Sequence, residues 1–182
     1  MTSPARKRAV SWALEQLGAP VLMGYRGDLR FDRKLRTLMP HGLGFDVWDC
    51  SGLYCGMLRA AGAKDMRGTH NAQLLHDGSR ELLPEESPRP GDGVFYGLPV
   101  VDSKSGMVLT PAHANVVHVA VWAAGGKCVS ADGATWGITS LEQARAARCQ
   151  VRLHETIHYR GDCPYVVVRR SLWLDELDKI SS

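Results

Sequence analysis

The clearest alternation of hydrophobic and polar positions lies at residues 117–122, which read Val-His-Val-Ala-Val-Trp. A period of two predicts a β-strand, with the valines at 117, 119 and 121 on one face. His118 then shares the other face with Ala120 and Trp122. This strand therefore carries a titratable ring on a rigid backbone, among small and aromatic neighbours.

Period, capping and turn signals elsewhere predict several more elements. The predicted helices run from Ser3-Pro4 to Gly18, start after Asp49, after the cap Thr69 and after Ser171, and open at the Ser140–Gln143 capping box; those at Thr69 and Ser171 are short. The predicted strands cover residues 94–96, 127–131, 151–157 and 165–170. Gly125-Gly126 is expected to join two antiparallel strands. Residues 21–48 are glycine-rich and charged, and we expect them to be irregular. No linker or repeat interrupts the chain, which favours one α+β domain over residues 1–182, with helices packed on an antiparallel sheet.

A cysteine stands at the start of the second helix. Asp49 is a good N-cap, and apolar residues recur at helical spacing from Leu53 to Ala61. Cys50 would then lie in the first helical turn, where unpaired N–H groups and the helix dipole favour the thiolate. The alternative is an unreactive structural cysteine. The nearby prediction of a base on a strand favours the reactive interpretation.

His118 is the candidate base for that thiol. An isolated strand histidine is usually a satisfied core residue, which is the alternative here. Together with Cys50 upstream, however, it fits the nucleophile–base arrangement of papain-like thiol enzymes.

Four short motifs occur in an order typical of one family. They are residues 13–20 (Ala-Leu-Glu-Gln-Leu-Gly-Ala-Pro), 49–53 (Asp-Cys-Ser-Gly-Leu), 89–96 (Arg-Pro-Gly-Asp-Gly-Val-Phe-Tyr) and 118–121 (His-Val-Ala-Val). In this order the chain resembles the NlpC-type cell-wall cysteine peptidases, which cut the peptide stems of bacterial peptidoglycan. The resemblance implies a papain-like fold whose nucleophile lies at a helix N-terminus, and a thioester mechanism without a cofactor or metal.

The resemblance also implies roles for further residues. A third polar group orients the histidine in the family, and Ser130 falls at its place on the next strand. Asp132, on the same face two residues later, is the alternative, and it would add a charge to stabilise the imidazolium. Around the nucleophile, Asp49 and Ser51 are expected to contact substrate. The family's active-site tyrosine is replaced by Val21, with Tyr25 as a possible substitute, and the connection at 98–116 is long for the family.

Composition and the N-terminal segment suggest where such an enzyme acts. A chain of 182 residues with 45% hydrophobic content can bury one full core. No apolar run resembles a transmembrane helix or a signal peptide. We therefore expect a monomer made in the cytoplasm without membrane insertion, which acts on peptidoglycan after release. A phage endolysin or virion-associated lysin fits these features.

Five cysteines and seven histidines make zinc a rival hypothesis. No Cys-x-x-Cys pair or His-Glu-x-x-His run is present, which disfavours a metal site. The odd number of cysteines without paired spacing likewise predicts reduced thiols. His154 and His158 share a helix-like spacing, but they lie in a segment predicted to be extended.

Charge is distributed unevenly along the chain. Residues 1–40 hold eight Lys or Arg and three acidic residues, a net +5, so the remainder carries −2 of the total +3. A basic segment beside the site can attract anionic wall polymers. Nucleic acid is a competing partner, but no recognition motif accompanies the charge. A solvated surface is the third interpretation.

Two other functions remain open at this stage. An amidase or acyltransferase would use the same Cys50–His118 pair on a different acyl group. A non-enzymatic phage tail or assembly module would keep the fold alone.

Overall fold

The computed structural model describes residues 2–64, 71–101, 103–107 and 115–180. Within these ranges the helices are α1 (Pro4–Glu15), α2 (Cys50–Ala61), α3 (Ala72–Asp77), α4 (Leu141–Ala146) and α5 (Leu172–Ile180). The strands are β1 (Tyr25–Gly27), β2 (Leu29–Asp32), β3 (Thr37–Pro40), β4 (Val47–Trp48), β5 (Arg80–Glu81), β6 (Gly93–Leu98), β7 (Asn115–Trp122), β8 (Cys128–Ala131), β9 (Val151–His154) and β10 (Tyr165–Arg170). Helices and antiparallel strands in this arrangement confirm the predicted α+β class.

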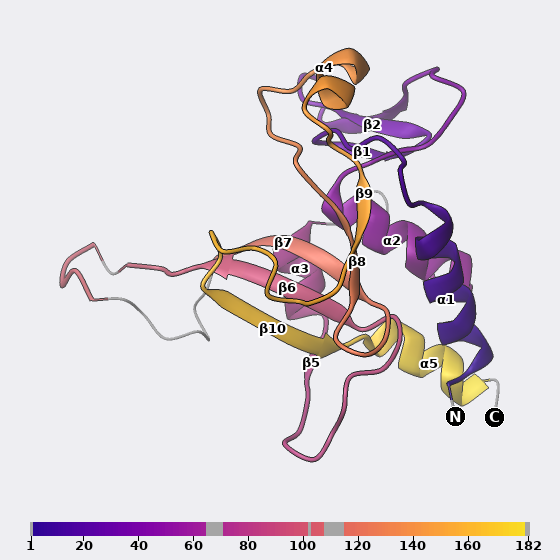
Figure 1. Ribbon diagram of the computed structural model, residues 1–182, viewed down its shortest axis with the longest axis vertical. Coiled ribbons are helices and arrows are strands. Elements are labelled where there is room, and N and C mark those ends of the chain that lie inside the picture. The colour runs from indigo at the N-terminus through magenta and orange to yellow at the C-terminus, as the bar shows by residue number, and fades with distance from the viewer. Residues whose placement is uncertain (1, 65–70, 102, 108–114, 181–182) are drawn as a thin grey trace.

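The larger sheet has the strand order β5-β10-β6-β7-β8-β9. Helices α1, α2 and α3 pack against one of its faces, where Phe95, Val119 and Val129 join the main core. The opposite face of β6, β7 and β8 is covered by residues 155–164, which form a smaller apolar cluster with it. Figure 1 shows α3 behind the central strands β6 and β7, and α1 beside α5 near the two chain ends.

The start of α2 agrees with its prediction. The Asp49 carboxylate accepts from the backbone N–H of Gly52 at 2.7 Å, and Gly62 ends the helix in the left-handed conformation. A side chain at position 52 would place its Cβ 2.6 Å from the carbonyl oxygen of Tyr25. Glycine therefore allows the first turn of α2 to approach β1, which brings Cys50 against the small sheet.

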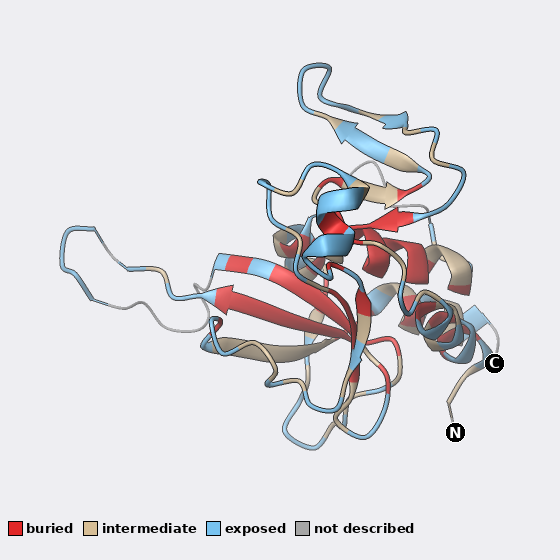
Figure 2. Ribbon diagram, turned by 45° about the horizontal axis from the view of Figure 1, so that its top comes forward, coloured by how far each residue is buried: buried red, intermediate tan, exposed pale blue. Residues whose placement is uncertain are grey.

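Residues 21–48, predicted to be irregular, instead contain a four-stranded antiparallel sheet of order β3-β2-β1-β4. Each strand has only two to four residues, too few for a period of two to be visible in the sequence. These strands are identified by their backbone pairing with neighbouring strands of the same segment, and not by an alternation of apolar and polar side chains. The β2–β3 hairpin projects away from the rest of the molecule and is largely exposed (Figure 2).

The predicted valine face of β7 was also wrong at one position. A β-bulge opposite Tyr96 and Gly97 makes Val116 pair with Gly97, so Val117 drops out of the alternation and is 41% exposed. Val119 and Val121 face the helices as predicted, and His118 lies on the other face. A bulge inserts one residue and re-aims the strand's side chains.

Other boundaries differ slightly from the predictions. Strand β9 ends at His154, before Ile157, and α3 begins after Asn71, whose side chain caps it. The predicted cap Thr69 lies outside the described residues. The Gly125-Gly126 turn between β7 and β8, the Ser3 cap and the Ser140 capping box are confirmed.

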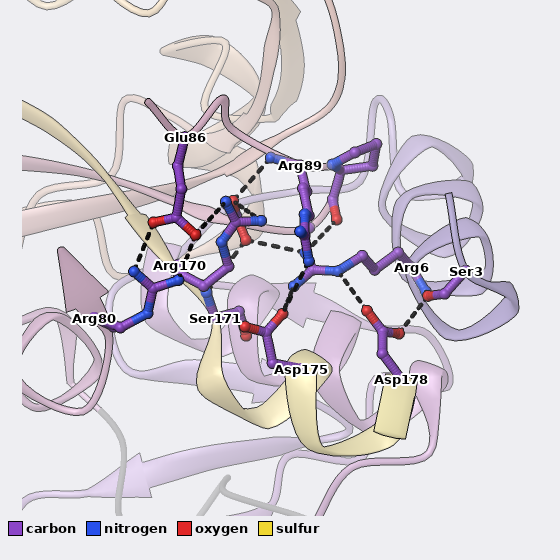
Figure 3. Close-up of polar contacts among 12 residues, drawn as sticks. Ser3, Arg6, Arg80, Glu86, Arg89, Arg170, Ser171, Asp175 and Asp178 are labelled. Carbon is purple, nitrogen blue, oxygen red and sulfur yellow. Dashed lines mark hydrogen bonds and ion pairs between the residues drawn. The ribbon is translucent and has the colours of Figure 1, made fainter. Parts of the chain in front are cut away.

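The Pro90-Gly91-Asp92 turn is secured by a buried ionic cluster (Figure 3). Asp92 is fully buried, and it accepts from the Arg6 guanidinium at 3.0 Å and from the backbone of Arg89 at 2.8 Å. The oxygen that accepts from Arg89 also lies 3.5 Å from the guanidinium of Arg170, which is itself buried. Asp92 thus connects α1, the entrance to β6 and the end of β10, and this structural role explains its place in the motif.

No helix in the described ranges is both long and apolar enough to cross a membrane.

Candidate active site

Cys50 is the first residue of α2 and is partly buried. Its sulfur lies within hydrogen-bonding reach of the backbone groups of Ser51 and Val119, which act to lower the thiol pKa. The thiol therefore contacts β7 at the residue that follows His118.

Asp49 organises the turn in front of the thiol. One carboxylate oxygen accepts from the Ser51 hydroxyl at 3.0 Å as well as from Gly52, and the other accepts from the Gly24 N–H at 3.0 Å. Arg26 lies 3.4 Å away. These bonds give the carboxylate and the Ser51 hydroxyl partners within the protein. Both residues therefore stabilise the backbone turn on which Cys50 lies.

A hollow of about 350 Å³ opens over the thiol. Asp49, Cys50 and Ser51 line it together with Val116 and Val117 from the bulged end of β7. Tyr25, the third residue expected to contact substrate, lines an adjoining hollow and packs its ring against His41 at a centroid distance of 5.3 Å.

His118 is buried and held by a polar network on the outer face of the sheet. Its Nε2 lies 2.7 Å from the Ser130 hydroxyl and 3.1 Å from the Tyr159 hydroxyl. Ser130 donates to Asp132 at 2.7 Å, and Tyr159 donates to Ser130 at 2.7 Å. His154 bonds the second oxygen of Asp132 and stacks on the Tyr159 ring at 3.6 Å.

The hydrogen bonds of this network indicate which ring nitrogen of His118 carries the hydrogen. The Ser130 hydrogen goes to Asp132, and the Tyr159 hydrogen goes to Ser130 or Asp132, so neither hydroxyl has a hydrogen left for the ring. Nε2 must then carry its own hydrogen and donate. Nδ1 of the neutral ring is consequently the basic nitrogen.

Both candidate orienting residues, Ser130 and Asp132, belong to this network. Ser130 contacts the ring directly, whereas the nearer Asp132 oxygen is 3.8 Å from Nε2 and acts through Ser130. The sequence left open which of the two orients His118. In the structure both belong to one hydrogen-bonded chain, in which Ser130 contacts the ring and Asp132 contacts Ser130.

Burial shifts the pKa of both side chains of the pair. Burial, and then the Asp49 carboxylate, raise the pKa of the Cys50 thiol to about 12. Burial, and then the Arg160 guanidinium, lower the pKa of His118 to about 3, although Asp132 opposes the shift. Both shifts favour the uncharged forms of the two side chains, because desolvation disfavours charge, and so they oppose the effect of the helix start on the thiol. Within the described residues no hydrogen bond or ion pair joins Cys50 to His118.

Sequence analysis missed Tyr159, His154 and Arg160 as site residues. Tyr159 and Arg160 come from the connection between β9 and β10, about forty residues after His118. Arg160 pairs with Asp162 at 2.9 Å and acts on the pKa of both Cys50 and His118. Neither residue belongs to a recognisable motif, so only the folding of this connection over the sheet brings them to the site.

Among the described residues, no group of three or more His, Cys, Asp or Glu side chains is arranged to hold a metal ion. His154 is engaged by Asp132, and His158 lies in a turn.

Comparison with known proteins gives a consistent fold assignment. No family model and no curated protein matches the sequence. Among solved structures, NlpC1 of Trichomonas vaginalis is similar over 92% of this chain and 44% of its own, with 20% identity and a TM-score of 0.54. This chain therefore spans under half the length of that protein. The P60 domain of a Mycobacterium avium subspecies paratuberculosis antigen covers 92% of this chain and 95% of its own, with 18% identity and a TM-score of 0.52.

A third structure separates the fold from the chemistry. RipD of Mycobacterium tuberculosis covers 91% of this chain and 97% of its own, with 18% identity and a TM-score of 0.53. It is described as a non-catalytic NlpC/p60 domain protein adapted to peptidoglycan binding. The chain thus has the α+β fold of NlpC/P60 domains, and RipD is a protein with this fold that is described as non-catalytic.

Proposed function

We propose that this protein is a cysteine hydrolase that cuts peptide stems of bacterial peptidoglycan. One observation carries the proposal: a helix-start thiol lies against the strand that bears His118, and a Ser130–Asp132–Tyr159 network holds the Nε2 side of that ring. The network leaves Nδ1 as the basic nitrogen of the neutral ring, which is what a general base requires.

The mechanism begins from a neutral pair. As the Cys50 sulfur attacks the peptide carbonyl carbon, its proton passes to Nδ1 of His118, and a tetrahedral oxyanion forms. Backbone N–H groups at the start of α2, including that of Cys50, are placed to stabilise this oxyanion. His118 then gives the proton to the leaving amine, which leaves a thioester. Water attacks the thioester after losing a proton to His118, and the proton returns to the sulfur as the carboxylic acid product departs.

The network supplies what this mechanism needs at its charged steps. When His118 becomes an imidazolium, Asp132 stabilises it through Ser130, and the bond from Nε2 keeps the ring from rotating. Arg160 opposes the imidazolium, which favours prompt return of the proton to the leaving group.

The substrate assignment is supported by a structural neighbour, RipB of Mycobacterium tuberculosis, which is named as a peptidoglycan hydrolase and is similar with a TM-score of 0.51 and 18% identity. Within that class we propose an endopeptidase. A phage endolysin or virion-associated role rests on the sequence alone and has no support among the neighbours.

The test is hydrolysis of purified cell walls by wild type and Cys50→Ala. We expect wild type to lower wall turbidity and to release new stem-peptide amines, identified by mass spectrometry. Cys50→Ala should be folded and inactive, while Cys149→Ala, which replaces a buried thiol outside the lining of the hollow over Cys50, should remain active. Activity in the folded Cys50→Ala variant would refute the nucleophile. Release of free lactyl groups without new amines would instead identify an amidase.

Non-catalytic wall binding is the second candidate. It is favoured by the protonated resting thiol and by the likeness to RipD. Wild type that sediments with walls, yet leaves their peptides intact, would establish it.

A further inference from the structure

The hollow over Cys50 is one end of a longer depression. A second hollow of about 450 Å³ adjoins it, and Met23, Phe31 and Trp136 line both. The depression runs from the start of α2 to the β2–β3 hairpin, and we call it the hairpin groove. An extended substrate that reaches the thiol has room to continue along it.

The far end of the hairpin groove is basic. Arg30, Arg33 and Lys34 line it, and the acidic residue among its described lining is Asp32. The Asp32 carboxylate accepts from the backbone N–H groups of Lys34 at 2.8 Å and Leu35 at 2.9 Å. Both bonds are accepted by Oδ1 and the carboxylate keeps its charge, but the three cations outnumber it, so this wall presents a net positive charge to a ligand.

One of these cations is held in place. The Arg33 guanidinium lies 3.7 Å from the centroid of the Trp136 ring, a cation–π contact that restricts it while leaving its N–H groups at the edge for an acceptor. An ordered guanidinium loses less entropy on binding than a freely moving one.

A short series of contacts also links the basic end of the groove to the start of α2, where the thiol lies. The Trp136 ring packs on Gly24, within 3.6 Å of where a Cβ would stand, and the Gly24 N–H donates to Asp49. The aromatic wall, the helix cap and Cys50 are therefore positioned by one short stretch of backbone. A ligand bound along this wall is directed toward the sulfur.

We propose that the hairpin groove binds the part of the substrate that carries free carboxylates, and so selects stem peptides with free rather than amidated carboxyl groups. The proposal rests on the proposed function and adds its substrate preference. Guanidinium groups match carboxylates by paired hydrogen bonds as well as charge. A peptide is favoured over nucleic acid because the groove leads into the hollow of an acyl-transfer thiol.

The experiment measures binding separately from cleavage. Two synthetic stem tetrapeptides, one with free carboxylates and one with the same groups as carboxamides, are titrated into the Cys50→Ala protein by calorimetry. We expect the free peptide to bind about tenfold more tightly, since charge-assisted hydrogen bonds are lost on amidation. Adding Arg33→Gln and Lys34→Gln should reduce this preference to less than about twofold. The matched control is Arg36→Gln, which removes a charge from the same hairpin outside the groove lining, and it should keep the preference.

Each outcome decides between the proposals. Equal binding of both peptides, no binding of either, or a preference that survives Arg33→Gln/Lys34→Gln would overturn the groove assignment. Cleavage of both peptides at equal rates by wild type would leave the hydrolase proposal standing and reject the groove preference. Preferential binding of the free peptide without any cleavage by wild type would support the groove preference and reject the hydrolase proposal. A single-stranded oligonucleotide that binds more tightly than the free peptide, and loses binding in the double variant, would assign the groove to nucleic acid.

Discussion

Replacing Asp132 by asparagine tests the polar network most directly. The change keeps the size of the side chain but removes the charge that lies 3.8 Å from Nε2 of His118. Two unit charges at that separation attract by about 4 kcal/mol at an effective dielectric constant of about 20. This attraction exists only once His118 is protonated, so its loss falls on the transition state rather than on substrate binding.

We expect a smaller effect than the full attraction. The amide oxygen of the substituted side chain can still accept from Ser130, and Tyr159 still contacts the ring, so the ring stays in place. A fall in kcat of about 10- to 100-fold, or about 1.4 to 2.7 kcal/mol, is expected with little change in KM. Because Asp132 raises the pKa of His118, the acid limb of the pH profile of kcat/KM should also move to lower pH in the variant.

The assay is steady-state release of stem-peptide amines between about pH 2 and pH 9, a range that includes the lowered pKa of His118, which is about 3. Glu155→Gln is the matched control, because it removes a carboxylate that is 74% exposed and paired with Lys127 just beyond β9. Unchanged kcat in Asp132→Asn, or an equal fall in both variants, would refute the role given to the network. A rise in KM with kcat unchanged would place Asp132 in substrate binding instead.

Two other properties follow from the structure. Because its pKa is raised to about 12, Cys50 should react slowly with iodoacetamide at about pH 7, and the rate should rise about tenfold per pH unit up to about pH 10; mass spectrometry of the Cys50 peptide that shows a plateau below about pH 8 would contradict the neutral resting pair. Asp92→Asn should lower the free energy of unfolding in urea by about 3 kcal/mol, because it leaves the buried Arg6 and Arg170 guanidinium groups without their shared carboxylate. Glu81→Gln, which removes a carboxylate that is 78% exposed, should cost less than about 1 kcal/mol; equal losses in the two variants would contradict the structural role of Asp92.

The sequence by itself determined the elements that follow from local chemistry. Asp49 and Ser140 predicted the starts of two helices. A short polar side chain just before an apolar stripe can accept from the free backbone N–H groups of the first helical turn. The alternation around His118 located β7 and its two faces, and counting through the Gly125-Gly126 turn placed Ser130 beside the ring. These inferences depend on residues close in the chain, which is why they could be made without a structure.

Only the tertiary structure decided the contacts between distant segments and the protonation they impose. The strands of residues 21–48 are too short to show a period, and the bulge at Val117 depends on pairing with β6. Tyr159 and Arg160 reach the site because their connection folds over the outer face of the sheet. The helix dipole visible in the sequence favoured a thiolate at Cys50, but the burial that raises its pKa arises only when β7 and α2 pack together. Desolvation is a property of the assembled core, and no local pattern of residues records it.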